Sequence, residues 1–207
     1  MDKATMRAVM AASVVAVTNV LAFTPCSDYS PNPVPASQLP TFFSQQNVTN
    51  IETLLEKDPI DRLLSHYAHT IDARAFDGLS DIFNVNATAV YPSSPGVLDG
   101  VEAIKTSIAG MLAQFSGTQH LIGSKDIRLC GERKAISIAY FSAAHFLPQN
   151  ATSANPQVVD DSDVIYAYGQ YQDSWEKQDG LWKIVHRNQV FMVSLLESQE
   201  STFLEPT

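Results

Sequence analysis

The sequence predicts an α+β fold in which a curved sheet wraps around three helices that precede most of its strands. Three observations support this. Apolar residues recur at helical spacing in the first half of the domain, the segments after Gly117 are extended, and glycine-containing turns separate several of these segments. Helices followed by a run of antiparallel strands are typical of α+β layer folds. Such a sheet encloses a pocket against its helices, and we expect the chemistry there.

Three helices are expected before the main run of strands. The first should begin at Asp58, a favourable N-cap, with Pro59 in the first helical position. A short second helix follows, and Asp99 with Glu102 forms a capping-box pattern for the third. The apolar faces should consist of Ile60, Leu63, Leu64, Tyr67 and Ile71, then Phe76, Leu79, Ile82 and Phe83, then Val101, Ile104, Ile108, Met111, Leu112 and Phe115.

The strands are predicted from extended apolar segments. Gly131-Glu132 and Asp179-Gly180 mark hairpin turns, and a long polar loop covers Pro148 to Ser162. The predicted strands are Ala87–Tyr91, Thr118–Ile122, Ile127–Cys130, Ala135–Leu147, Val164–Trp175 and Leu181–Phe191.

The chain is expected to divide into a signal peptide (1–22), a proline-rich extended arm (23–57), one domain (58–191) and a tail (192–207). Basic Lys3 and Arg7 precede an apolar run that ends in small residues, which is typical of a secretory signal cleaved before Phe23. A membrane anchor is the alternative, but the run is short and interrupted by polar residues, so stable membrane insertion is not expected.

Glycosylation sequons and two cysteines fit the secretory pathway. Asn47, Asn86 and Asn150 each begin an Asn-X-Thr sequon. In the oxidising secretory lumen, or outside the cell, Cys26 and Cys130 can form one bridge that ties the arm to the domain. A loop of about 100 residues would contribute nearly 5 kcal/mol in the chain-entropy description. Two unpaired cysteines are the alternative.

The composition predicts a folded acidic protein. Hydrophobic residues make up 45% of the chain and charged residues 17%, which is enough for a full core. The net charge is −9 and the sequence pI is about 4.8. An acidic surface repels phosphate backbones, so nucleic acid is not an expected partner.

The histidines fall into separate groups. His66 and His69 lie opposite the apolar face of the first helix, so they should face solvent and not hold a metal. His186 fits an ordinary buried histidine. His120 and His145 lie in strands that should line the enclosed face. The face of His145 carries small side chains that leave a hollow beside the imidazole, namely Ala135, Ser137, Ala139 and Ala143. Core histidines bonded to carbonyl groups remain the alternative.

The segment Thr118-Gln119-His120-Leu121-Ile122-Gly123, with Ala143-Ala144-His145, resembles scytalone dehydratase and its SnoaL-like relatives in the nuclear-transport-factor-2-like superfamily. The separation of the two histidines, and that of Asp72 from Tyr91, also agree with this family. The pattern from Trp175 to Lys183 is similar to the superfamily's last hairpin. The resemblance covers 58–191 and implies a cone-shaped barrel, whose curved mixed sheet is mostly antiparallel and wraps around three helices.

The resemblance implies a dehydratase of a hydroxylated carbonyl compound of polyketide or terpenoid type, with no metal or organic cofactor. His145 would pair with Asp72, His120 would be the second acid–base group, and Tyr91 would hold a water or a carbonyl oxygen. Histidine titrates near neutral pH and suits both proton transfers. A cyclase or isomerase, and a secreted protein that binds a small ligand without turnover, are the alternatives. A homo-oligomer is possible.

The substrate pocket should be lined by Tyr67, Ile71, Phe141 and Gln170. Ile71 occupies the position of a family tyrosine, which Tyr67, one helical turn earlier, can replace. The family's serine and asparagine on the penultimate strand are absent, and Gln170 lies in that stretch. Scytalone itself is therefore not the expected substrate.

Overall fold

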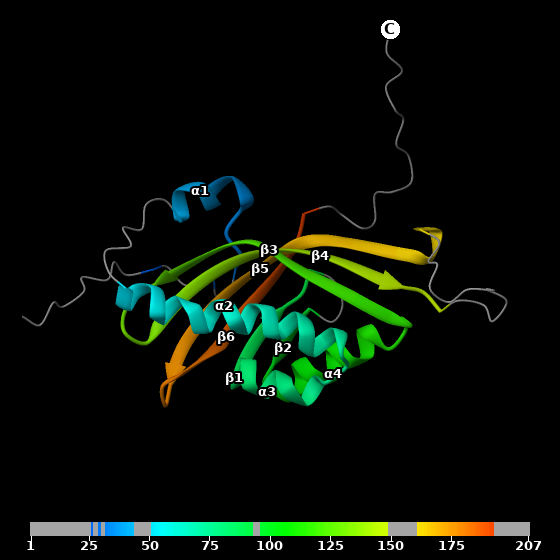
Figure 1. The fold of residues 1–207 in the computed structure, drawn as a ribbon, viewed down its shortest axis with the longest axis horizontal. Helices are drawn as coiled ribbons and strands as arrows, with labels where there is room; N and C mark the ends of the chain where they lie inside the picture. Colours follow the sequence, from blue (N-terminus) through cyan, green and yellow to red (C-terminus); the bar gives the residue numbers. More distant parts are fainter. Residues whose placement is uncertain are drawn as a thin grey trace, which may run out of the picture.

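A six-stranded sheet curves over three of the helices in the computed structural model, which describes residues 26, 29, 32–43, 51–92, 96–148 and 161–192 (Figure 1). The strand order is β2-β1-β6-β5-β4-β3, with β1 and β6 parallel and all other neighbours antiparallel. The strands are β1 (Phe83–Val90), β2 (Val97–Asp99), β3 (Gly117–Leu129), β4 (Lys134–Phe146), β5 (Val164–Gln178) and β6 (Leu181–Phe191). The predicted α+β class and mixed sheet are confirmed, although the sheet is not closed.

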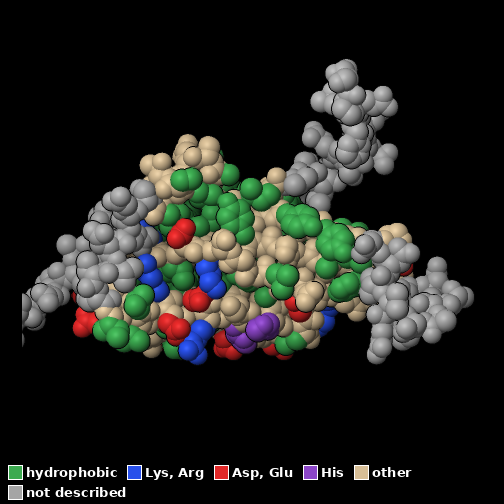
Figure 2. All heavy atoms as spheres, turned by 45° about the horizontal axis from the view of Figure 1, so that its top comes forward, with side chains coloured by type: hydrophobic (Ala, Val, Ile, Leu, Met, Phe, Trp, Pro, Cys, Tyr) green, Lys and Arg blue, Asp and Glu red, His purple; other side chains and the backbone are tan. Residues whose placement is uncertain are grey.

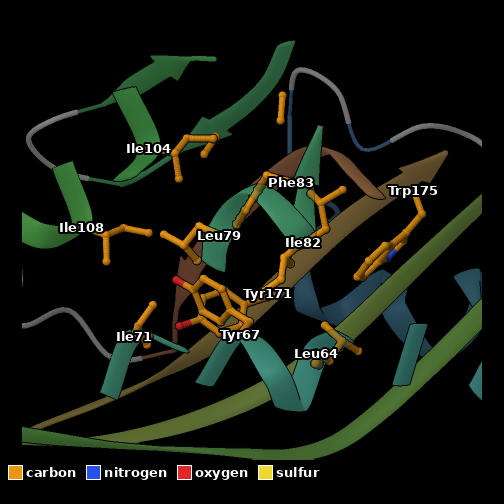
Figure 3. Packing of buried hydrophobic residues seen from close by; sticks show 14 of the residues in the cluster. Leu64, Tyr67, Ile71, Leu79, Ile82, Phe83, Ile104, Ile108, Tyr171 and Trp175 are labelled. Atoms are coloured by element: carbon orange, nitrogen blue, oxygen red, sulfur yellow. The ribbon is translucent and has the colours of Figure 1, made fainter. Parts of the chain in front are cut away.

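The inner face of the sheet carries the main helices and the core. The helices on this side are α2 (Ile51–Asp72), α3 (Leu79–Ile82), preceded by a 3-10 turn (Phe76–Gly78), and α4 (Val101–Leu112). Figure 3 shows Leu64 and Tyr67 of α2 packed with the α3 side chains and with Tyr171 and Trp175 of β5. The indole N–H of Trp175 donates a hydrogen bond to the Ser137 hydroxyl at 2.8 Å. The small Ser137 side chain of β4 thus leaves room for the large Trp175 side chain in the core and satisfies its N–H group.

The first helix begins earlier than predicted. It starts at Ile51, and Pro59 lies inside it, where it leaves the Leu55 carbonyl without its helical N–H donor. A tertiary contact anchors these additional turns, because Lys177 of β5 forms an ion pair with the Glu56 carboxylate at 2.7 Å. Asp58 is not an N-cap and instead pairs with Arg62 at 2.7 Å.

Two other local predictions were also wrong. Asp99 does not cap α4, because it is held in β2 opposite Thr88, and Gly100 with φ +85° is the N-cap. The two strands predicted on either side of Gly123 are one strand, β3, whose pairing with β4 shifts register between Ile122 and Lys125. The last strand has its predicted bounds, Leu181–Phe191. The turn before it has positive φ at Asp179 and Gly180, as a type I′ hairpin requires.

A bulge in β6 decides which face His186 occupies. Trp175 pairs with Ile184 but Ser174 pairs with His186, so Val185 is an extra residue on β6. Simple alternation would place His186 on the face of Ile184. The bulge turns it to the other face, where it is buried and its Nδ1 lies 2.6 Å from the Thr88 hydroxyl.

The outer face of the sheet is partly covered by the N-terminal arm. The arm is not simply extended, because it contains a 3-10 turn (Ala36–Gln38) and α1 (Leu39–Phe42), which lies on the opposite side of the sheet from α2 (Figure 1). A disulfide joins Cys26 to Cys130. The carbonyl of the fully buried Tyr29 accepts a hydrogen bond from Asn188 of β6 at 2.9 Å. The backbone of Val34 exchanges two bonds with the Gln172 side chain, at 2.8 and 2.9 Å.

Beyond the arm, hydrophobic side chains gather on the exposed part of the outer face (Figure 2). They include Leu121 of β3, Tyr140 of β4, and Tyr166 and Tyr168 of β5. A homo-oligomer stays a prediction.

Several predicted features lie outside the described residues, namely the signal peptide (1–22), the sequons at Asn47 and Asn150, and the tail beyond Met192. Asn86 is described and exposed on β1. Among the described helices, none has the length and apolar character needed to span a membrane.

Candidate active site

A cavity of about 360 Å³ lies between the inner face of the sheet and helices α2 and α4. Its walls are mostly apolar and aromatic, with a few polar groups, as is usual for sites that bind small molecules. The lining side chains include Tyr67, Ile71, Tyr91, Ile108, Phe115, His120, Phe141, His145, Ala167, Tyr171, Gln189 and Phe191.

Six of the residues singled out from the sequence line this cavity: Tyr67, Ile71, Tyr91, His120, Phe141 and His145. Gln170 does not, so its prediction was wrong. Its buried amide nitrogen lies 3.0 Å from Met192 Sδ, and its oxygen accepts a bond from Gln172, a residue of the outer face. Side chains alternate along a strand, so Tyr171 points into the cavity in its place.

Asp72 and His120 form the central polar pair. The carboxylate oxygen Oδ1 lies 2.7 Å from His120 Nδ1, and Oδ2 accepts the backbone N–H of His120, also at 2.7 Å. Thr118 donates its hydroxyl to Oδ1 at 2.8 Å. Burial raises the pKa of Asp72, but these hydrogen bonds lower it more, so the net pKa lies below the ordinary value. The carboxylate is therefore ionised and accepts a hydrogen bond from His120 Nδ1–H.

The expected pairing of Asp72 with His145 was wrong. Asp72 is the last residue of α2, and this helix packs along β3, so the carboxylate meets the backbone and imidazole of His120. His145 lies one strand further away, on β4, opposite Thr118. The two histidine rings are nevertheless neighbours, with centroids 5.4 Å apart and planes at 85°.

His145 is held by a backbone carbonyl. Its Nδ1 lies 3.2 Å from the carbonyl oxygen of Ile165, and its ring packs against Phe115 with centroids 4.8 Å apart. Burial lowers the pKa of His145, and the neighbouring His120 lowers it further. The imidazole of His145 is therefore neutral at neutral pH.

The hydrogen bonds fix the tautomers of both rings. A carbonyl oxygen and an ionised carboxylate can only accept, so Nδ1 carries the hydrogen in His120 and in His145. In the neutral rings Nε2 is then the atom with a free lone pair. Two neighbouring imidazoles with basic Nε2 atoms in one aromatic cavity can take up and return a proton.

Tyrosine hydroxyls are the hydrogen-bond donors of the cavity. Burial raises the pKa values of Tyr67, Tyr91 and Tyr171, so all three phenols are neutral donors. Figure 3 shows the hydroxyls of Tyr67 and Tyr171 pointing the same way, toward the side of the core where Ile71 and Ile108 lie. Among the described residues, no hydrogen bond of good geometry holds the buried Tyr91 hydroxyl, although it interacts with the Tyr67 hydroxyl, so it can turn toward a bound molecule.

A buried ion pair beneath these tyrosines was missed from the sequence. Arg187 donates to both carboxylate oxygens of Asp173 at 2.7 and 2.8 Å, and both side chains are fully buried. The guanidinium lies 4.2 Å from the ring centroids of Tyr67 and Tyr171. Asp173 lies two residues after Tyr171 on β5, so its side chain points to the same inner face. This alternation is the sequence signal that could have predicted a buried charge there.

Phe141 forms one wall of the cavity and depends on Gly169. The two residues are paired directly across β4 and β5. A Cβ on Gly169 would lie 2.7 Å from two ring carbons of Phe141, so the ring occupies the space that glycine leaves. Phe141 then stacks on Tyr171, with centroids 4.4 Å apart and an interplanar angle of 17°. This arrangement defines a flat aromatic wall.

Within the described residues, no group of three or more His, Cys, Asp or Glu side chains is placed to hold a metal ion. His66 and His69 are exposed on α2, away from the cavity, as expected. The absence of a metal or cofactor requirement stays a prediction.

Acidification is expected to destabilise the folded chain in two windows. The pKa of His145 is lowered on folding, so its contribution to stability is present above about pH 6.5 and is lost as the pH falls below it. Asp72, whose pKa is also lowered, loses its contribution below about pH 4. Denaturant midpoints measured between about pH 7 and 5 should fall less for His145→Gln than for the wild type. His66→Gln is the matched control, and an equal fall in His145→Gln and the wild type would contradict the assignment.

Comparisons with known proteins agree with this architecture. Residues 52–188 match the model of the SnoaL-like domain family. An uncharacterized protein of Mycobacterium tuberculosis is 26% identical over 146 residues, which cover 70% of this chain and 88% of that protein.

Two crystal structures share the fold. A candidate scytalone dehydratase from Novosphingobium aromaticivorans superposes with a TM-score of 0.57 at 24% identity, over 68% of this chain and 87% of that one. The hexachlorocyclohexane dehydrochlorinase LinA type 2 gives a TM-score of 0.57 at 18% identity, over 69% of this chain and 89% of that one.

Proposed function

This chain belongs to the SnoaL-like domain family, and we propose that it is a cofactor-independent lyase that removes water from a hydroxylated carbonyl compound. One observation carries this assignment: the Asp72–His120 pair opens on an aromatic cavity that also contains a second, neutral imidazole. The names of two structural neighbours, a dehydratase and a dehydrochlorinase, describe elimination reactions. The family assignment expected from the sequence is confirmed.

The first step is removal of a proton from the carbon beside the carbonyl group. His120 Nε2 takes this proton, and the electron pair of the C–H bond passes into an enolate. Asp72 stabilises the imidazolium that forms, because its ionised carboxylate accepts the Nδ1–H of the same ring. This is the role that the resemblance implied for His145, and the observed contacts favour His120.

The enolate oxygen needs hydrogen-bond donors. The buried Tyr91 hydroxyl has no hydrogen bond of good geometry among the described residues and can donate to it, and the Tyr67 hydroxyl, which interacts with Tyr91, lies in the same wall. In the second step the enolate re-forms the carbonyl, its carbon–carbon electron pair forms a new double bond between the α- and β-carbons, the carbon–oxygen bond at the β-carbon breaks, and His120 returns its proton to the departing oxygen as water. Donors fixed in a buried cavity stabilise such charge better than water does.

An isomerase of the same class of compound is the second candidate, and one observation favours it. Only one imidazole among those lining the described cavity is backed by a carboxylate, so one base can take a proton and return it to another carbon. Enolisation is common to both reactions. His145, a neutral acceptor, would orient a substrate hydroxyl in either case.

A panel of cyclic β-hydroxyketones and β,γ-unsaturated ketones tests the assignment. Ultraviolet absorbance of the conjugated enone reports loss of water, and proton NMR reports a shifted double bond. A lyase should form the enone from the hydroxyketones, and an isomerase should move the double bond of the unsaturated ketones into conjugation without losing water. Binding of these ketones without either product, in folded protein, would favour a ligand-binding protein instead.

We also propose that the chain enters the secretory pathway and is glycosylated. Supporting features are the signal-like segment 1–22, the exposed sequon residue Asn86 and the disulfide. Intact mass before and after deglycosylation should show a chain that begins near Phe23 and loses glycan mass. An unchanged mass with Met1 retained would contradict secretion.

A further inference from the structure

We propose that Thr118 and Arg74 are positioning residues, which hold the Asp72 carboxylate in the orientation that receives His120. This inference rests on the proposed role of Asp72 and His120 as the catalytic base. Neither Thr118 nor Arg74 lines the described cavity, so they would act through Asp72 and not on the substrate.

A directed chain of hydrogen bonds links these residues. Arg74 donates through one guanidinium nitrogen to the Thr118 oxygen at 3.1 Å, and a guanidinium can only donate. The Thr118 oxygen is therefore an acceptor toward Arg74, and its own hydrogen points to Asp72 Oδ1 at 2.8 Å. The same oxygen of Asp72 receives Nδ1–H of His120. Each member of the chain thus fixes the direction of the next.

Arg74 is anchored at two further points. The nitrogen that contacts Thr118 also lies 3.3 Å from the Ile71 carbonyl, and the other terminal nitrogen donates to the Phe115 carbonyl at 3.4 Å. These contacts tie the end of α2 to the segment that leads from α4 into β3. The guanidinium therefore spans the two elements whose relative position sets the distance between Asp72 and His120.

The backbone of Arg74 supports a specific role for its side chain. Its φ is +58°, a left-handed conformation that disfavours residues with a Cβ, and a helix normally ends there with glycine or asparagine. Non-glycine residues held in such conformations are concentrated at functional sites. An arginine here costs stability, and its contacts with Thr118 and Phe115 give a reason for its presence.

The charges around the pair are balanced. The Asp72 carboxylate of the pair has the opposite charge to Arg74, which reaches it through Thr118, and the imidazole of His145 lies beside His120. The phenols of Tyr67 and Tyr91 are neutral, and Arg187 is neutralised by Asp173 in a separate buried pair. The pKa of His145 is lowered mainly by burial and next by His120, and the positive charge of Arg74 lowers it to a smaller extent. Arg74 thus offsets the Asp72 charge and favours the basic form of that ring.

Thr118→Val tests the inference, because it keeps the shape of the side chain and replaces only the hydroxyl with a methyl group. The readout is the nitrogen-15 and proton NMR signal of His120 Nδ1–H, which needs no substrate. In the wild type this proton should exchange slowly with solvent. In Thr118→Val it should broaden or split between tautomers, and Thr118→Ser should restore it. On a ketone turned over by the wild type, kcat should fall about tenfold with KM nearly unchanged.

Arg74→Gly is the second variant and should fold well, because glycine accepts the positive φ. Its melting temperature should rise or stay equal while the His120 Nδ1–H signal broadens and kcat falls, a combination that a purely structural arginine would not give. An unaltered NMR signal in both Thr118→Val and Arg74→Gly would overturn the inference. Should no ketone be turned over, the proposed function fails, yet the NMR comparison still decides the positioning role.

Discussion

Replacing His120 with glutamine is expected to lower turnover of a ketone substrate by about 10²–10⁴-fold, the usual contribution of a general base. Glutamine has a similar length and can donate an amide hydrogen to Asp72, so the carboxylate is not left unpaired. The variant should therefore fold with a nearly unchanged melting temperature. Steady-state kinetics and thermal denaturation on the same samples separate the loss of the base from loss of structure.

The matched controls are His145→Gln and His69→Gln. Among the described residues no carboxylate pairs with His145, whose Nδ1 bonds to the Ile165 carbonyl, so its loss should raise KM more than it lowers kcat. His69 is exposed on α2 and outside the cavity, so its loss should change neither. Equal turnover by His120→Gln and the wild type, in folded protein, would remove His120 from the mechanism.

Replacing Cys130 with serine is expected to lower the free energy of unfolding by up to about 5 kcal/mol. The bridge to Cys26 spans 104 residues, so cutting it frees a long loop in the unfolded chain. It also releases the arm from the outer face, where Tyr29 and Val34 bond to Asn188 and Gln172. Guanidinium unfolding of oxidised wild type, reduced wild type and Cys130→Ser measures the loss.

The cavity offers an internal control for this experiment. It lies on the inner face of the sheet, and the arm lies on the outer face, so kcat of Cys130→Ser should stay near the wild-type value at low temperature. Equal unfolding midpoints for oxidised wild type and Cys130→Ser would show that the bridge does not stabilise the fold.

The sequence predicted the inward-facing residues better than their partners. Period-two alternation placed His145 and Phe141 on one face of β4, and helical spacing placed Tyr67 and Ile71 on one face of α2. These are local properties, and the cavity contains all four side chains. The same alternation, applied along β5 from Trp175, identifies Tyr171 and excludes Gln170.

The partner of Asp72 could not be predicted in the same way. Whether a carboxylate at the end of α2 reaches β3 or β4 depends on how the helix sits on the sheet, a tertiary property with no local signal. The start of α2 was missed for a similar reason. Pro59 is a good first helical residue, but the contact between Glu56 and Lys177 joins segments far apart in the chain.

The bulge in β6 could not be predicted from the alternation of side chains along the sequence either. His186 alternates with Ile184 in the sequence, yet the extra residue Val185 turns it to the outer face. Gln172 and Asn188 are polar, so their strands look solvent-exposed on that face in the sequence. They are buried because the backbone of the N-terminal arm covers them and accepts their hydrogen bonds.

Incorporation of solvent deuterium beside the carbonyl group of a bound ketone tests the central claim most directly, because it detects proton removal by His120 even when no water is lost. Wild-type protein in deuterium oxide should label a cyclic β-hydroxyketone, or its analogue without the hydroxyl, faster than buffer does. His120→Gln should lower this excess rate by about 10²–10⁴-fold. Labelling at the buffer rate by wild type with the ketone bound, or equal labelling by wild type and His120→Gln, would contradict an acid–base role for the Asp72–His120 pair.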